Sequence, residues 1–138
     1  MTRSGPDDAP RKGMSEARAI EGLLAYAQKR PRWGNAAIDC LSEAIARSRA
    51  LARECPGEHT ELLARCLGTA AKVLLKRRRA TEALPLAEEA VTLTRAGGGA
   101  PLVVSLQRLA AVLEALHRYS DAAATMAEAD KVTPPPES

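Results

Sequence analysis

Apolar side chains recur along this chain at intervals of three and four residues, the spacing of one face of an α-helix. Six such stretches follow one another, separated by short polar or Gly- and Pro-containing segments. The pattern predicts helices over about 16–29, 35–53, 59–76, 81–95, 101–116 and 120–132. The clearest stripe consists of Val103, Leu106, Leu109, Ala110, Leu113 and Leu116.

Pro and Gly mark the ends of these stretches. Cys55-Pro56-Gly57 is expected to end the second helix, and the next helix is expected to start near His59 or Thr60. Gly97-Gly98-Gly99 is expected to end the fourth helix. The predicted layout is a disordered leader over 1–14, a helical domain over 15–133 and a disordered tail over 134–138. Within the domain, the helix pairs span about 16–54, 59–96 and 101–133.

One sequence pattern occurs twice, at 80–91 and at 119–130. Each copy has a hydroxyl residue suited to a helix N-cap, then an acid, then Ala, followed by further small or apolar residues. Ala83 and Ala122 are 39 positions apart. A helix pair repeated at a fixed period is typical of a helical solenoid, in which neighbouring units bury each other's apolar faces.

The composition supports an all-α fold with closely packed helices. Hydrophobic residues make up 46% of the 138 residues, yet there is no Phe, one Trp and two Tyr. Ala and Leu have high helix propensity, and a core of Ala, Leu and Val lets helices approach each other closely. The length fits a single domain.

Large and small apolar residues recur at matching positions in the three predicted helix pairs. In the last pair these positions hold Leu106, Leu109, Ala110, Leu113, Tyr119, Ala122, Met126, Ala129 and Pro134. In the middle pair they hold Leu67, Ala70, Ala71, Leu74, Ala83, Ala87 and Ala90, and in the first pair Ile20, Leu23, Leu24, Ala27, Ala37, Leu41 and Ala44. This arrangement resembles the tetratricopeptide repeat (TPR) family. The resemblance implies a right-handed α-solenoid of three antiparallel helix pairs, six helices in all.

The chain departs from the family pattern in two respects. Ala stands at positions where the family has Gly, Tyr or Phe, and the spacings of 46 (Ala37 to Ala83) and 39 exceed the usual repeat length. In this it is similar to the longer-period repeats of kinesin light chains and of bacterial multi-repeat regulators. An unrelated helical bundle with an Ala-rich core is the alternative fold.

The resemblance implies a non-catalytic protein–protein interaction module, an adaptor or regulator, whose concave groove is lined by the first helix of each pair. The expected groove residues are Arg18, Glu21, Lys29, Arg65, Thr69, Lys72, Lys76, Val104, Gln107, Arg108, Ala111 and Glu114. Basic residues predominate among them, which favours a partner peptide or helix that is acidic or ends in a carboxylate. The alternative is that they are solvated helix faces. Recognition of chaperone C-termini is disfavoured, because Thr69 and Val104 replace the Asn and Lys of those family members.

A basic turn, Lys76-Arg77-Arg78-Arg79, is the basis of an alternative function. It could contact nucleic acid or an acidic partner. No aromatic residue is interleaved with it for base stacking, and a formal net charge of +3 is modest. A helix end whose charge complements the helix dipole is the simpler explanation, so nucleic acid is not the expected partner.

Candidate catalytic and metal-binding groups are few. His59 and His117 have no nucleophile or acid at a catalytic spacing, so no enzyme activity is expected. Cys55, His59 and Cys66 lack the paired spacings of zinc sites, and Cys66 falls on an apolar stripe. The Gly-rich segment lacks the Lys and Ser or Thr of a phosphate loop. No cofactor and no metal are therefore expected.

The remaining expectations concern location and assembly. No apolar run is long enough to span a bilayer, the N-terminus has no signal-peptide core, and the cysteine count is odd, so a cytoplasmic location is expected. No polar helix follows Val132, which leaves an apolar side of the last helix uncovered and predicts a homodimer through it. The chain could be free-standing or part of a larger regulator.

Overall fold

The computed structural model describes residues 8–29 and 34–132. In that part of the chain it contains six α-helices: α1 (Asp8–Lys29), α2 (Ala36–Glu54), α3 (Pro56–Lys76), α4 (Ala80–Arg95), α5 (Gly99–Ala115) and α6 (Tyr119–Val132). No strand occurs among these residues. The predicted all-α class and the six predicted helices are therefore confirmed.

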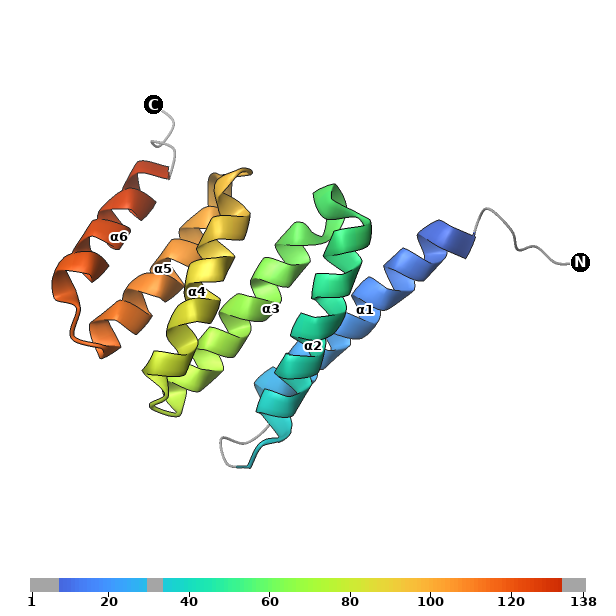
Figure 1. The fold of residues 1–138 in the computed structure, drawn as a ribbon, viewed down its shortest axis with the longest axis horizontal. Helices are drawn as coiled ribbons and strands as arrows, with labels where there is room; N and C mark the ends of the chain where they lie inside the picture. Colours follow the sequence, from blue (N-terminus) through green and yellow to red (C-terminus); the bar gives the residue numbers. More distant parts are fainter. Residues whose placement is uncertain (1–7, 30–33, 133–138) are drawn as a thin grey trace, which may run out of the picture.

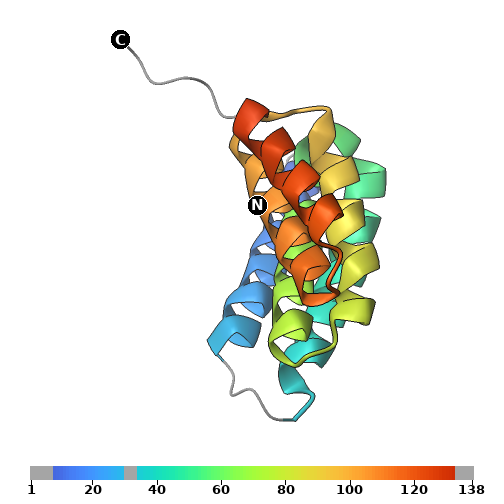
Figure 2. The ribbon, with the colours of Figure 1, turned by 90° about the vertical axis from the view of Figure 1, so that its left-hand side faces the viewer.

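The helices form a row of antiparallel pairs in two layers (Figures 1 and 2). Each helix packs against the next one along the chain, as in a helical repeat. In addition, α3 lies against both α1 and α5, whereas the backbones of α2, α4 and α6 do not approach one another. Because α1, α3 and α5 are the more closely spaced layer, they form the inner side of the row.

The repeated Ala positions are buried at the same places in successive pairs. Ala37, Ala83 and Ala122 lie near the start of the second helix of each pair and are all buried. Seven residues further on, Ala44, Ala90 and Ala129 are buried too. A larger side chain at these positions would push neighbouring helices apart. The Ala residues of the repeated pattern are therefore packing positions.

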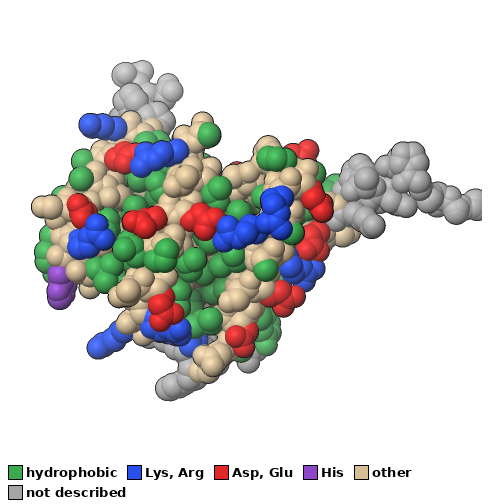
Figure 3. Space-filling view, in the orientation of Figure 1, with side chains coloured by type: hydrophobic (Ala, Val, Ile, Leu, Met, Phe, Trp, Pro, Cys, Tyr) green, Lys and Arg blue, Asp and Glu red, His purple; other side chains and the backbone are tan. Residues whose placement is uncertain are grey.

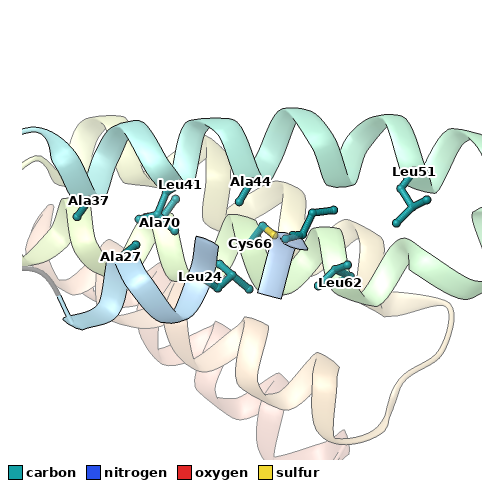
Figure 4. Close-up of a cluster of buried hydrophobic side chains, with 10 residues drawn as sticks. Leu24, Ala27, Ala37, Leu41, Ala44, Leu51, Leu62, Cys66 and Ala70 are labelled. Carbon is teal, nitrogen blue, oxygen red and sulfur yellow. The ribbon is translucent and has the colours of Figure 1, made fainter. Parts of the chain in front are cut away.

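The largest cluster of core side chains joins the first three helices (Figure 4). Leu24 and Ala27 of α1 face α2, and Cys66 of α3 lies in the same interior with no exposed surface. Leu109, placed on the core stripe by the sequence, is only half-buried and packs at the edge of two other clusters.

The turns inside the second and third pairs have the same geometry. Arg78 and His117 occupy the left-handed region, with φ of 64° and 62°, and they are 39 positions apart. The next residues, Arg79 and Arg118, each form an ion pair with the acid three positions later, at 2.7 and 2.9 Å. The period of the sequence is therefore also a period of the structure.

The outer layer is joined by a second repeated contact. Arg49 of α2 pairs with Glu89 of α4 at 2.5 Å, and Arg95 of α4 pairs with Glu128 of α6. The two Arg are 46 positions apart and the two Glu are 39 apart, the same spacings as the Ala positions. Figure 3 shows this face, where acidic and basic side chains lie next to one another. These pairs link helices whose backbones are not in contact.

Two helix starts, those of α1 and α3, differ from the sequence predictions by more than two residues. α1 begins at Asp8, so the expected leader over 1–14 is helical from that residue onward. Pro10 is the third residue of α1, where the backbone N–H would have no intrahelical acceptor, so it does not prevent a helix. Thr81 and Ser120, expected N-caps, each lie one residue inside their helices.

The second difference is at the junction of α2 and α3. Only Cys55 separates the two helices, and Pro56 is the first residue of α3. Pro is favoured at this position because its fixed φ suits the first helical turn. The Cys55-Pro56-Gly57 segment was expected to be a loop ending near His59, so that prediction was wrong. Residues 1–7, the tail over 134–138 and Pro134 lie outside the described residues.

Candidate functional site

An open cleft of about 610 Å³ runs along the inner layer, between α1, α3 and α5. Its polar lining side chains are Glu21, Gln28, Glu61, Arg65, Thr69, Thr94, Ser105 and Arg108. A second cleft of about 290 Å³ lies between α3 and α5 and is lined by Lys72, Leu75, Val104, Gln107, Arg108, Ala111 and Val112. Because Val104 and Arg108 line both, we treat the two clefts as one inner groove.

The structure brings eight of the twelve predicted groove residues together. One of them, Glu21, belongs to α1, and the other seven belong to α3 and α5: Arg65, Thr69, Lys72, Val104, Gln107, Arg108 and Ala111.

Four predicted residues line neither cleft, although all of them are exposed: Arg18, Lys29, Lys76 and Glu114. Lys29 follows Gln28 and so points about 100° away from it around the helix. Lys76 is the last residue of α3, and Arg18 lies almost one turn before the first lining residue of α1.

Arg108 is held in the groove by its contact with Gly68. A Cβ atom at Gly68 would lie 3.1 Å from Cδ and 3.2 Å from Nε of Arg108, closer than side chains normally approach. The absence of a side chain at Gly68 therefore lets the Arg108 side chain cross the surface of α3. The sequence analysis did not identify Gly68, which lies among other small residues on α3.

Among the described residues, the guanidinium of Arg108 has no counter-ion. It is half-buried, and burial lowers its pKa from the ordinary value for arginine. Within the described part of the chain, Arg108 forms no hydrogen bond and no ion pair. A partly desolvated cation without a partner is unfavourable, so an anion in the groove would gain more from Arg108 than from a fully solvated side chain.

Charge is unevenly distributed along the groove. At the α1 side, Arg65 Nη1 lies 3.6 Å from Glu21 Oε2, and Glu61 adds a second acid. At the α5 side, Lys72 and Arg108 face the groove with no acid among the lining residues. Three basic and two acidic side chains line the groove among residues 8–29 and 34–132, and its positive end lies between α3 and α5.

The basic turn over 76–79 is partly used in structural contacts. Arg77 Nη1 donates a hydrogen bond to the carbonyl oxygen of Gly34 at 2.5 Å, and Arg79 donates to Glu82 at 2.7 and 3.0 Å. Lys76 and Arg78 remain exposed. Two of the four charges are therefore committed within the chain, which leaves a small positive surface for nucleic acid.

Comparisons with known protein families, with curated proteins and with solved structures find no match to this chain. No helix in the described part is long and apolar enough to cross a membrane. The candidate site is therefore defined by its geometry alone.

Proposed function

We propose that this chain is a non-catalytic interaction module that binds an acidic segment of another protein in the inner groove. We further propose that its helix pairs form a right-handed solenoid of the TPR type and that it serves as a cytoplasmic adaptor or regulator. The observation that carries the proposal is Arg108, a half-buried cation that faces the groove with no partner in the described part of the chain. The repeated helix pairs and the open inner layer support it.

The strength of the contact comes from the environment of Arg108. A hydrogen bond between a charged donor and a carboxylate contributes about 1.5–3 kcal/mol when it is partly shielded from water. Arg108 has already lost part of its hydration in the free protein, so an incoming carboxylate restores an interaction instead of displacing one. Lys72, also unpaired in the described chain, adds attraction at the same end of the groove.

The apolar lining indicates what should accompany the acid. Val104 is 45% exposed and stands beside Arg108, while Leu75 and Ala111 form the wall next to Lys72. An aliphatic side chain of the ligand would bury this surface while its acidic neighbour contacts Arg108. We therefore propose a ligand with Asp or Glu next to an aliphatic residue.

Selection from a random displayed peptide library tests this chemistry. We expect enriched peptides to contain Asp or Glu adjacent to Leu, Ile or Val. Enrichment of basic peptides, or enriched peptides that bind equally well with the acids replaced by Asn or Gln, would contradict the proposal. If nucleic acid displaces the peptide and its affinity falls steeply with salt concentration, the alternative function, nucleic-acid binding, would be favoured.

Substitution of Gly68 by Ala is expected to separate binding from stability. The new Cβ would displace Arg108 from α3, so the affinity for a selected peptide should fall. Ala has a higher helix propensity than Gly by about 0.8–1 kcal/mol, which offsets the cost of moving a flexible Arg side chain. Fluorescence anisotropy and urea denaturation measure the two quantities.

Gly22→Ala is the matched control for this change. Gly22 also lies inside a helix, but a Cβ there meets nothing within 4 Å. It should raise the free energy of unfolding by about 1 kcal/mol and leave peptide affinity unchanged. If Gly68→Ala and Gly22→Ala bind the peptide with equal affinity, the contact between Gly68 and Arg108 plays no part in binding.

A further inference from the structure

The junction of α2 and α3 brings together three side chains of the kinds that bind transition metals. Cys55 is the N-cap residue of α3, and Glu58 and His59 follow in its first turn. The backbone N–H groups of Glu58 and His59 donate to the carbonyl oxygen of Cys55 at 3.1 and 3.2 Å. These bonds fix the backbone from which the three side chains project.

The ligand atoms of this cluster converge. The Cys55 sulfur, a Glu58 carboxylate oxygen and a His59 ring nitrogen all lie within 4.8 Å of one another. Glu58 Oε1 and His59 Nε2 are 3.6 Å apart. In a tetrahedral zinc site with bonds of about 2.0–2.3 Å, neighbouring ligand atoms are roughly 3.3–3.7 Å apart. Small rotations of the exposed Cys55 and Glu58 side chains would bring the ligand atoms to these separations.

His59 is the fixed member of the cluster. Its side chain is 14% exposed, and Nε2 lies 3.9 Å from the position of a Cβ at Gly13 of α1. The imidazole therefore sits against α1, close to the chain at Gly13. A metal ion held here would contact residues from the α2–α3 junction while lying next to α1.

The charges of the three ligands suit a divalent cation such as Zn²⁺. A Cys thiolate and a Glu carboxylate together balance the charge of a divalent ion. The N-terminal end of a helix carries partial positive charge and disfavours an unbalanced cation, but the complete site would be neutral. Sulfur and imidazole nitrogen are ligands that select zinc over magnesium or calcium.

We propose that Cys55, Glu58 and His59 form a Zn²⁺ site with a water molecule in the fourth position. The ion would link the end of α2 to the start of α3 beside α1. This revises the expectation of no metal, which rested on the absence of paired zinc-ligand spacings among Cys55, His59 and Cys66. Cys66 is fully buried in the core, and burial raises the pKa of its thiol, so it is not a ligand.

Cobalt and zinc titration of the reduced full chain without an affinity tag tests the site. Co²⁺ should bind one per chain and give a sulfur-to-cobalt charge-transfer band, and Zn²⁺ should displace it and raise Tm. Cys55→Ser should abolish the band. His59→Gln removes a direct ligand and should lower the affinity for Zn²⁺ by more than about tenfold, because loss of a residue that only supports a ligand already lowers metal affinity by about 10–100-fold.

Cys40→Ser is the control, because Cys40 is a free thiol on α2 outside the cluster. It should leave the cobalt band and the Tm shift unchanged. The proposal is overturned if the wild-type chain gives no charge-transfer band, or if the band survives in Cys55→Ser. Circular dichroism of each variant shows whether the helices are retained, so a loss of binding by unfolding is recognised.

Discussion

Substitution of Leu67 by Ala is expected to lower the free energy of unfolding by about 2–5 kcal/mol, the range for truncating a fully buried Leu. Leu67 has no exposed surface. It packs with Leu63 and Ala64 of α3 and Ala90 of α4, and Ile45 of α2 lies against the same cluster. The substitution would therefore leave a cavity where the first and second helix pairs meet.

Urea denaturation followed by circular dichroism measures this change. Met126→Ala is the control, because Met126 is 39% exposed on α6 and its truncation should change the free energy of unfolding by less than about 0.5 kcal/mol. If Leu67→Ala falls within that small range as well, the interface between the first two pairs is not packed as the structure has it.

Reversal of charge at Arg108 is expected to have the largest effect on binding. Arg108→Glu should weaken a selected acidic peptide by at least about tenfold, because a charged hydrogen bond contributes about 1.5–3 kcal/mol and each 1.4 kcal/mol is a factor of ten. Repulsion between the new carboxylate and the acidic ligand adds to the loss. Arg108→Lys should retain part of the affinity, since the charge remains while the planar guanidinium is lost.

Fluorescence anisotropy with the selected peptide measures these affinities. Arg53→Glu is the matched control, because Arg53 is exposed in the last turn of α2, away from the inner groove. It makes the same change in net charge as Arg108→Glu. If the two variants lose affinity equally, the peptide responds to overall charge and the assignment of Arg108 is wrong.

The sequence predicted the helices and their packing positions well because the apolar stripes and the small residues are local signals. Ala83 and Ala122 are buried as their 39-residue spacing requires. The repeated ion pairs were also open to prediction, since Arg49 and Arg95 have the 46-residue spacing of the Ala positions. Both features depend on a period that the sequence displays directly.

The junction at Cys55 was mispredicted for a physical reason. Pro ends one helix and begins another with equal ease, because its missing N–H matters in neither place. The sequence alone favoured a break of several residues, whereas the chain makes the turn with Cys55 only. Glu58 was overlooked as a neighbour of Cys55 because a loop there would give the two side chains no fixed relation.

The groove was predicted in part. Arg65, Thr69 and Arg108, expected in the groove from the family resemblance, line the larger cleft. Gly68 and the pairing of Arg65 with Glu21 depend on how α1, α3 and α5 approach one another, which no local pattern contains. The predicted homodimer through α6 stays a prediction, supported by exposed Tyr119 and Met126 on that helix.

Chemical-shift mapping of a selected acidic peptide on the labelled chain tests the central proposal most directly. Binding in the inner groove predicts that the largest shifts occur on α3 and α5, at Gly68, Lys72, Val104 and Arg108. Shifts concentrated at the basic turn over 76–79 or on α6, with those four residues unchanged, would contradict it.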